Sequence, residues 1–198
     1  MMAAATTLSP AATALLSHPD WLDQELAERS LWEFTRQMWR WADPAPFQDN
    51  WHIGAICEHL QAVSTGEIRR LLINIPPHHC KSSLVSVMWP AWVWIRSPGT
   101  SFMAASYAQT LSTRDSVKCR RVIESPIYQR RWGAGFRLTG DQNTKTRFDN
   151  DRNGYRLATS VGGALTGEGG DVIIVDDAHN VADKESETIP QSTLDWWE

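Results

Sequence analysis

Residues 71–83 read LLINIPPHHCKSS, an apolar run followed by a turn that contains a lysine and two serines. The five residues Leu71–Ile75 are typical of a strand buried on both faces. The residues from Lys81 to about Ile95 have helical periodicity, with Pro90 expected to bend or break the helix. A strand-to-helix turn presents free N–H groups and the positive end of the helix dipole, which attract phosphate. The stretch therefore predicts a phosphate-binding loop.

The side chains of this loop suit a nucleotide. Lys81 would place a positive charge on the β- and γ-phosphates, and the Ser82 hydroxyl would be a Mg²⁺ ligand. Where the strict P-loop pattern has glycine this chain has Ile75 and Cys80, and a left-handed residue with a Cβ costs about 1–2 kcal/mol. The alternative is a helix that merely begins with polar residues. The residues expected to bind ATP in the loop are Pro77, His78, His79, Cys80, Lys81, Ser82 and Ser83.

A second apolar run, DVIIVDD at residues 171–177, ends in two carboxylates. Asp176 is placed to hold Mg²⁺, usually through water. Asp177 should face the other side of the strand, where it would orient or deprotonate an attacking water. The alternative for the two aspartates is a solvated acidic turn. His179 is interpreted as a hydrogen-bonding surface residue of the turn, with a metal ligand or base as the alternative.

Strand and helix patterns alternate along the rest of the chain. Helices are expected in four places and short antiparallel strands between Arg137 and Ala158, with Thr100 to Tyr107 as a further strand. This succession predicts an α/β fold with a mainly parallel central sheet flanked by helices. We divide the chain into a leader and helical segment, 1–46, and a nucleotide-binding domain, 47–198. The expected helices are Trp21 to Trp41 (one, or two broken near Ser30), 51–63, Thr110 to Glu124, and the residues from Lys184.

The composition argues against several classes of protein. A formal net charge of −4 argues against a surface coated with phosphate-binding side chains, so any DNA contact must be local. No apolar stretch is long enough to span a membrane, and three separated cysteines predict neither a disulfide framework nor a zinc site. Trp89, Trp92 and Trp94 are expected in the core, with a base-stacking platform as the alternative.

Five segments together resemble the large subunit of bacteriophage terminases. Their order and spacing carry the resemblance, which runs from about Phe47 to the C-terminus. The segments are IPPHHCKSS (75–83), SVMWPAWVWIRSPGT (86–100), SYAQTLSTRDSVKCRRVIESP (106–126), DQNTKTRF (141–148) and TSVGGALTGEGGDVIIVDDAHN (159–180).

The resemblance implies a P-loop NTPase of the ASCE type that hydrolyses ATP with Mg²⁺ and moves double-stranded DNA. By position, Lys81 and Ser82 take the P-loop roles, Asp176 the metal role, and Asp177 the catalytic role that many relatives give to Glu. Gln48 lies where the family reads adenine, and His78 lies where relatives often carry Arg. Arg114 is the candidate for a cation that reaches the γ-phosphate of a neighbouring subunit, with a solvated basic face that touches the DNA backbone as the alternative.

The same resemblance implies partners and a place of action. The protein is expected to form a homo-oligomeric ring on a portal protein, to meet a small terminase subunit, and to work in the cytoplasm of a bacterial host. The family's C-terminal nuclease domain and coupling motif are not recognisable before Glu198, so we expect no nuclease activity. The alternative function is a truncated remnant that binds nucleotide, portal or small subunit without hydrolysing ATP.

Overall fold

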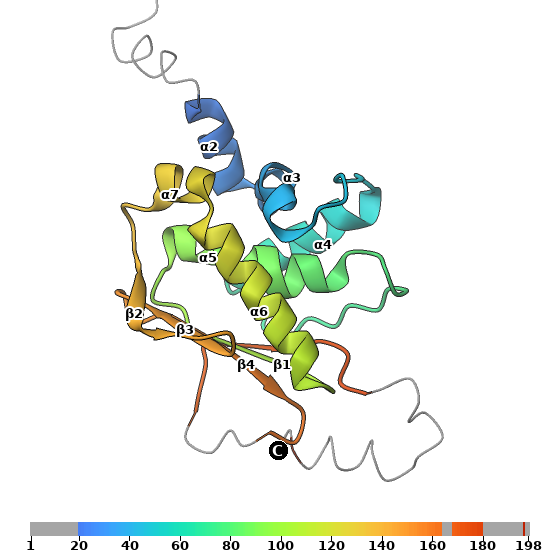
Figure 1. Cartoon of the computed structure of the whole chain (residues 1–198). Coiled ribbons are helices and arrows are strands. Elements are labelled where there is room, and N and C mark those ends of the chain that lie inside the picture. The colour runs from blue at the N-terminus through green and yellow to red at the C-terminus, as the bar shows by residue number, and fades with distance from the viewer. Residues whose placement is uncertain (1–19, 164–167, 180–195, 197–198) are drawn as a thin grey trace, which may run out of the picture.

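The computed structural model describes residues 20–163, 168–179 and 196, and these form an α/β fold in which helices lie against one twisted sheet (Figure 1). The expectations for residues 1–18 and for a helix from Lys184 lie outside the described residues. The described helices, in chain order, are α2 (Trp21–Arg29), α3 (Leu31–Ala42), α4 (Trp51–Ser64), η1 (Ser83–Met88), α5 (Trp89–Arg96), α6 (Gln109–Glu124) and α7 (Pro126–Trp132).

The predicted break near Ser30 is confirmed. Ser30 is extended and its side chain accepts a hydrogen bond from the Glu33 N–H, which caps α3 and ends the helix before it. α4 and α6 occupy the segments where the sequence predicted helices. Ser125-Pro126 ends α6 as expected, but it also starts α7, because Ser125 caps the new helix and proline is tolerated in its first turn.

The sheet is mixed rather than mainly parallel. Its order is β2-β3-β4-β1-β5, with β1 parallel to both of its neighbours β4 and β5. The pairs β2–β3 and β3–β4 are antiparallel, which confirms the short antiparallel strands expected after Arg137. Half of the pairings are therefore antiparallel, because this run of strands folds back on itself before β4 joins β1. The strands are β1 (Phe102–Ser106), β2 (Leu138–Asn143), β3 (Arg147–Asn150), β4 (Tyr155–Ser160) and β5 (Val172–Val175).

The expected central strand at Leu71–Ile75 is wrong. This segment is not paired with any described strand, although Leu71, Ile73 and Ile75 pack against the core. Leu72 is 83% exposed, so only one face of the segment is covered. β5 is likewise half-buried rather than buried, since Ile173 is 51% exposed. An apolar run indicates burial but does not distinguish one covered face from two.

The helix that follows the loop from Pro77 to Cys80 runs without a break from Lys81 to Arg96, and its π-helical segment η1 precedes Pro90. Proline has no N–H, so the Ser86 carbonyl lacks the donor that a regular α-helix would provide. Arg156 of β4 supplies one, because its Nη2 donates to Ser86 O at 2.6 Å. Arg156 is only 1% exposed, so this contact joins the helix to the sheet inside the core. The expected bend at Pro90 is thus absorbed as a change of helix type.

Tryptophans fill the space between helices and sheet, as predicted for Trp89, Trp92 and Trp94, which are all buried. Each indole N–H donates to an oxygen of another segment: to Ser64 Oγ, Ala27 O and Thr100 O, each at 2.8 Å. A base-stacking role for these three residues is excluded by their burial. None of the described helices is long and apolar enough to cross a membrane.

Replacing Trp94 by alanine should lower the free energy of unfolding by about 3–5 kcal/mol, because the side chain is 1% exposed and packs edge-to-face on Phe136 and Phe148. Urea denaturation measures the loss. Trp51 is 82% exposed, so Trp51→Ala is the matched control and should change stability by less than about 0.5 kcal/mol. Equal losses at the two sites would contradict the placement of the core.

Candidate functional site

The loop before η1 has an unusual backbone. It runs from Pro77 to Cys80, and the helix begins at Lys81. His78 and Cys80 have positive φ angles of 66° and 64°, and Cys80 O accepts the first helical hydrogen bond, from Leu84 N at 2.9 Å. Alternation of left-handed and right-handed residues lets successive N–H groups converge on an anion. The N–H groups of the first helical turn have no partner within a helix, so they are available to the same ligand.

Backbone strain is concentrated at this site. Among the described residues four non-glycine residues have positive φ, and three of them are His78, Cys80 and Asp177. The fourth, Asn153, lies in a turn where asparagine tolerates this conformation. Left-handed residues with a Cβ persist only where the surroundings hold them, and they cluster at functional sites.

The segment that contains Lys81 and the segment that contains Asp176 and Asp177 meet at one ion-pair cluster. Lys81 Nζ lies 3.0 Å from Asp176 Oδ1 and 2.5 Å from Asp177 Oδ1. Both aspartates are anchored through their backbones to the end of β1, because Asp176 N donates to Ala105 O and Tyr107 N donates to Asp177 O, each at 2.9 Å. The sheet therefore fixes the acidic pair, and the helix fixes the lysine opposite it.

The lysine of this cluster is held in its charged form. Partial burial by itself lowers the pKa of Lys81, but hydrogen bonds to Asp177 and Asp176 and the charges of both carboxylates outweigh it. The pKa of Lys81 is raised as a result. The side chain of Asp176 is 10% exposed and that of Asp177 is 55% exposed, so one carboxylate is enclosed and the other is open to solvent.

The expectation that Asp177 faces the other side of the strand is wrong. β5 ends at Val175, and Asp177 has a φ of 51°, which turns its side chain back towards Lys81. Side chains alternate only while the backbone remains extended. Both carboxylates therefore contact the same ammonium group, whereas separate positions were expected.

The remaining loop residues are placed as follows. Ser82 and Ser83 lie in the first helical turn, half-buried, and neither hydroxyl makes a hydrogen bond with a described residue. The His79 ring lies with Nδ1 2.8 Å from Pro77 O and packs on His52 of α4, with 5.5 Å between ring centroids. His52 was not predicted, because a single histidine at the start of a helix gives no signal of a contact made through the fold.

Two predicted residues lie apart from the cluster. Gln48 is exposed in the connection between α3 and α4, and its side chain makes no hydrogen bond with a described residue. Arg114 of α6 binds Asp115, with Nε–Oδ1 and Nη2–Oδ2 distances of 2.8 and 3.1 Å. These hydrogen bonds are the main reason that the pKa of Arg114 is raised, with partial burial opposing and the charges of Asp115, Asp176 and Asp177 adding to it. Arg114 is therefore within electrostatic range of the acidic pair.

The oxygen ligands of the site suit a magnesium ion that is shared with a phosphate. No group of three or more His, Cys, Asp or Glu side chains in the described part of the chain is arranged to hold a metal. Mg²⁺ at nucleotide sites takes one or two carboxylates and completes its shell with phosphate oxygens and water. Asp176 and the Ser82 hydroxyl are donors of this kind.

Comparison with known proteins does not assign a family. No protein-family model matches the chain, and no curated protein matches it significantly. Function must therefore be inferred from the geometry of Lys81, Asp176 and Asp177 and from the motifs around them.

The left-handed backbone at Cys80 can be tested by substitution. Cys80→Val should have a free energy of unfolding at least about 1 kcal/mol lower than Cys80→Gly, because a β-branched residue is strongly disfavoured at positive φ. Chemical denaturation of the two variants gives the difference. Ser97 is the control position, because its φ is −130° and a β-branched residue is tolerated at negative φ. A valine variant as stable as the glycine variant at position 80 would contradict the loop geometry.

Proposed function

We propose that the chain is a Mg²⁺-dependent ATPase domain of a DNA-packaging motor, similar to the N-terminal domain of phage terminase large subunits and built on a P-loop NTPase fold of the ASCE type. The observation that carries the proposal is the cluster in which Lys81 Nζ meets Asp176 and Asp177 at 3.0 and 2.5 Å. These residues are separated by about half of the chain, and a phosphate-binding lysine opposite a metal-binding carboxylate is the arrangement that nucleotide hydrolysis requires.

Binding of ATP exchanges the partners of Lys81. In the ligand-free arrangement its ammonium is shared by two carboxylates. A triphosphate brings more negative charge to the same lysine, which turns to the β- and γ-phosphates while N–H groups of the loop contact their oxygens. Asp176 and the Ser82 hydroxyl would hold Mg²⁺, which would supply positive charge to the phosphates when bound.

Release from Lys81 prepares Asp177 for catalysis. Its carboxylate is open to solvent, and its backbone is fixed by the hydrogen bond from Tyr107 N. Once Lys81 has turned to the phosphates, Asp177 is free to accept a hydrogen bond from the attacking water and to take its proton. In this account the base is masked by the lysine until nucleotide arrives.

The proposed motor acts as a homo-oligomeric ring on a portal protein, with a small terminase subunit and double-stranded DNA as further partners. The side chain of Arg114 is half exposed on α6, and its charge supports a role towards the γ-phosphate of a neighbouring subunit. Gln48 is exposed, so its side chain is accessible to an adenine ring.

A second candidate is a nucleotide-binding module without turnover. The observation that favours it is the 2.5 Å contact between Lys81 and Asp177, because a base held by the lysine is not available to water. Asp177 is also one methylene shorter than glutamate, so its reach towards a water is smaller.

Calorimetry and a hydrolysis assay distinguish these functions. With MgATP, Lys81→Ala should weaken binding by at least about tenfold, since one charged partner of the phosphates is lost. Asp177→Asn should keep binding and reduce the hydrolysis rate by about 10²–10⁴-fold, the usual contribution of a general base. Arg70→Gln removes an exposed cation outside the cluster and should change neither quantity.

Each possible outcome supports or contradicts at least one of the two candidate functions. Equal hydrolysis by wild type and Lys81→Ala would contradict an ATPase at this site. Binding without turnover, also in the presence of DNA and portal protein, would support the second candidate. Absence of any nucleotide binding by the wild-type chain would overturn both.

A further inference from the structure

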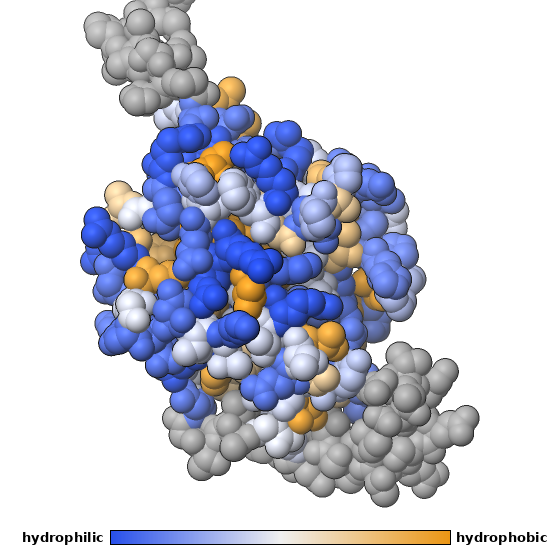
Figure 2. Space-filling model, viewed as in Figure 1, coloured by the Kyte–Doolittle hydropathy of each residue, from blue (hydrophilic) through white to orange (hydrophobic). Residues whose placement is uncertain are grey.

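A groove of about 600 Å³ runs along the outward side of α6. Its lining contains four cationic side chains and no carboxylate, and its remaining members are short polar residues and one valine. Figure 2 shows strongly hydrophilic residues over the middle of the face that α6 crosses. The groove is lined by Gln109, Thr110, Thr113, Arg114, Val117, Lys118, Arg121 and Lys145.

Helix geometry puts three of the cations in one row. Arg114, Lys118 and Arg121 follow each other at spacings of four and three residues, which is one face of an α-helix. The opposite face of α6 is buried through residues such as Cys119 and Val122. The row therefore cannot turn inwards, and its charges point away from the core.

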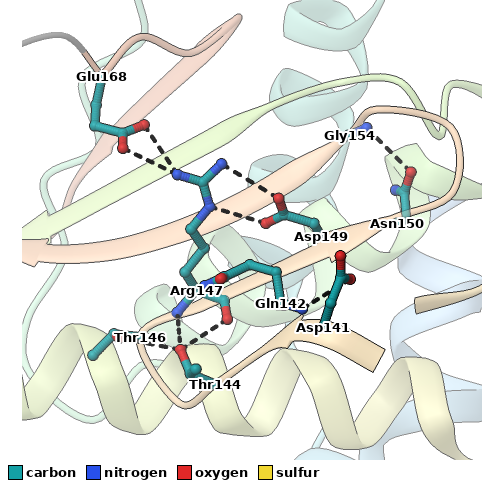
Figure 3. Close-up of polar contacts among 9 residues, drawn as sticks. All are labelled: Asp141, Gln142, Thr144, Thr146, Arg147, Asp149, Asn150, Gly154 and Glu168. Atoms are coloured by element: carbon teal, nitrogen blue, oxygen red, sulfur yellow. Dashed lines mark hydrogen bonds and ion pairs between the residues drawn. The ribbon is translucent and has the colours of Figure 1, made fainter. Parts of the chain in front are cut away.

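The fourth cation is brought to the row by the turn between β2 and β3. Arg120 Nη1 donates to Asn143 Oδ1 at 2.8 Å and to Thr144 O at 3.0 Å, which ties the turn to α6. Within the turn, Thr144 N donates to Arg147 O at 2.7 Å, and Thr144 Oγ1 accepts from Arg147 N at 3.0 Å (Figure 3). Lys145 lies at the tip of this braced turn.

Arg147 completes the brace. Its guanidinium binds Asp149 and Glu168, each within 3.3 Å, as Figure 3 shows, and stacks on the Tyr155 ring at 4.6 Å. Arg147 is thereby occupied inside the protein. Lys145, two residues earlier, makes no ion pair with a described residue and remains available to a ligand.

The charge of the groove is only partly balanced by the protein. Arg114 is paired with Asp115, and Lys118 Nζ lies 3.8 Å from Asp43 Oδ2, at the limit of an ion pair. Arg121 has no ion pair within the described residues, like Lys145. The groove therefore holds one firmly paired cation, one at the limit of an ion pair and two without an ion pair, in a chain whose formal net charge is −4.

We propose that this groove binds the sugar-phosphate backbone of double-stranded DNA without reading its sequence. Phosphate oxygens match Lys118, Arg121 and Lys145, while Arg114 is paired with Asp115. The hydroxyls of Thr110 and Thr113 and the amide of Gln109 are further donors of the type that contacts phosphates. No aromatic side chain lines the groove, so it offers no platform for unstacked bases. A duplex, which presents phosphates outwards and keeps its bases stacked, fits this lining better than a single strand.

The groove deepens the proposed motor function, because α6 connects it to the nucleotide site. α6 begins at Gln109, two residues after Tyr107, whose N–H donates to Asp177 O. The short segment from Tyr107 to Gln109 therefore connects the backbone of the acidic pair to the start of the helix that lines the groove. Binding of duplex to the groove requires no ATP, so it can be measured independently of hydrolysis.

The test measures binding of a fluorescent 25-base-pair duplex by anisotropy, without nucleotide, over a range of NaCl concentrations. For Arg121→Gln/Lys145→Gln, two phosphate contacts are lost, so the slope of log K against log salt should become shallower by about 2. At about 0.1 M salt the affinity should fall by at least about tenfold. The charge-preserving variant Arg121→Lys/Lys145→Arg should stay within about threefold of wild type.

Arg69→Gln/Arg70→Gln is the control for net charge, because both residues are exposed and neither lines the groove. An equal loss in this control, or wild-type affinity in the groove variant, would overturn the proposal. Tighter binding of a single strand of the same length would overturn the assignment to duplex. If the groove variant binds MgATP like wild type but not duplex, the DNA site is supported; if Lys81→Ala alone loses MgATP and keeps duplex, the two sites are shown to be separate.

Discussion

The structure depends on one lysine that pairs with two carboxylates. Without Lys81, Asp176 and Asp177 would lie close together with no cation between them, and two like charges at short range repel. The contact joins the segment before η1 to the segment after β5. No strand pairing of the described sheet links these two segments. It also sets the chemistry, because a ligand that competes for the lysine must compensate the acidic pair. In the proposed function, a triphosphate would compete for the lysine and Mg²⁺ would compensate the acidic pair.

The rigid surroundings explain how this site keeps its strained backbone. The helix that starts at Lys81 is anchored in the core by the tryptophans of α5 and by the contact from Arg156 to Ser86 O. On the other side, β1 fixes the backbone of both aspartates. Left-handed residues such as Cys80 are tolerated between two fixed supports, since relaxing them would move either the helix or the strand end.

Much of this arrangement could be predicted from the sequence, because it rests on local patterns. Helical periodicity located α3, α4 and α6, and Ser30 gave the break by its capping preference. The apolar runs before Lys81 and Asp176 drew attention to these residues, although the first run forms no paired strand. What escaped prediction depends on tertiary contacts: the open face at Leu72, the turn of Asp177 towards Lys81, and the brace that Arg120 makes with the β2–β3 turn. A one-dimensional pattern records neither which faces are covered nor where a backbone leaves its regular φ.

The most direct test of the exchange of partners at Lys81 is a crystal structure with Mg²⁺ and a non-hydrolysable ATP analogue. We expect Lys81 Nζ to leave Asp177 for the β- and γ-phosphates and the loop from Pro77 to Cys80 to surround these phosphates. Asp176 and the Ser82 hydroxyl would hold the metal. A nucleotide bound elsewhere, with both lysine–aspartate contacts intact at 3.0 and 2.5 Å, would contradict it.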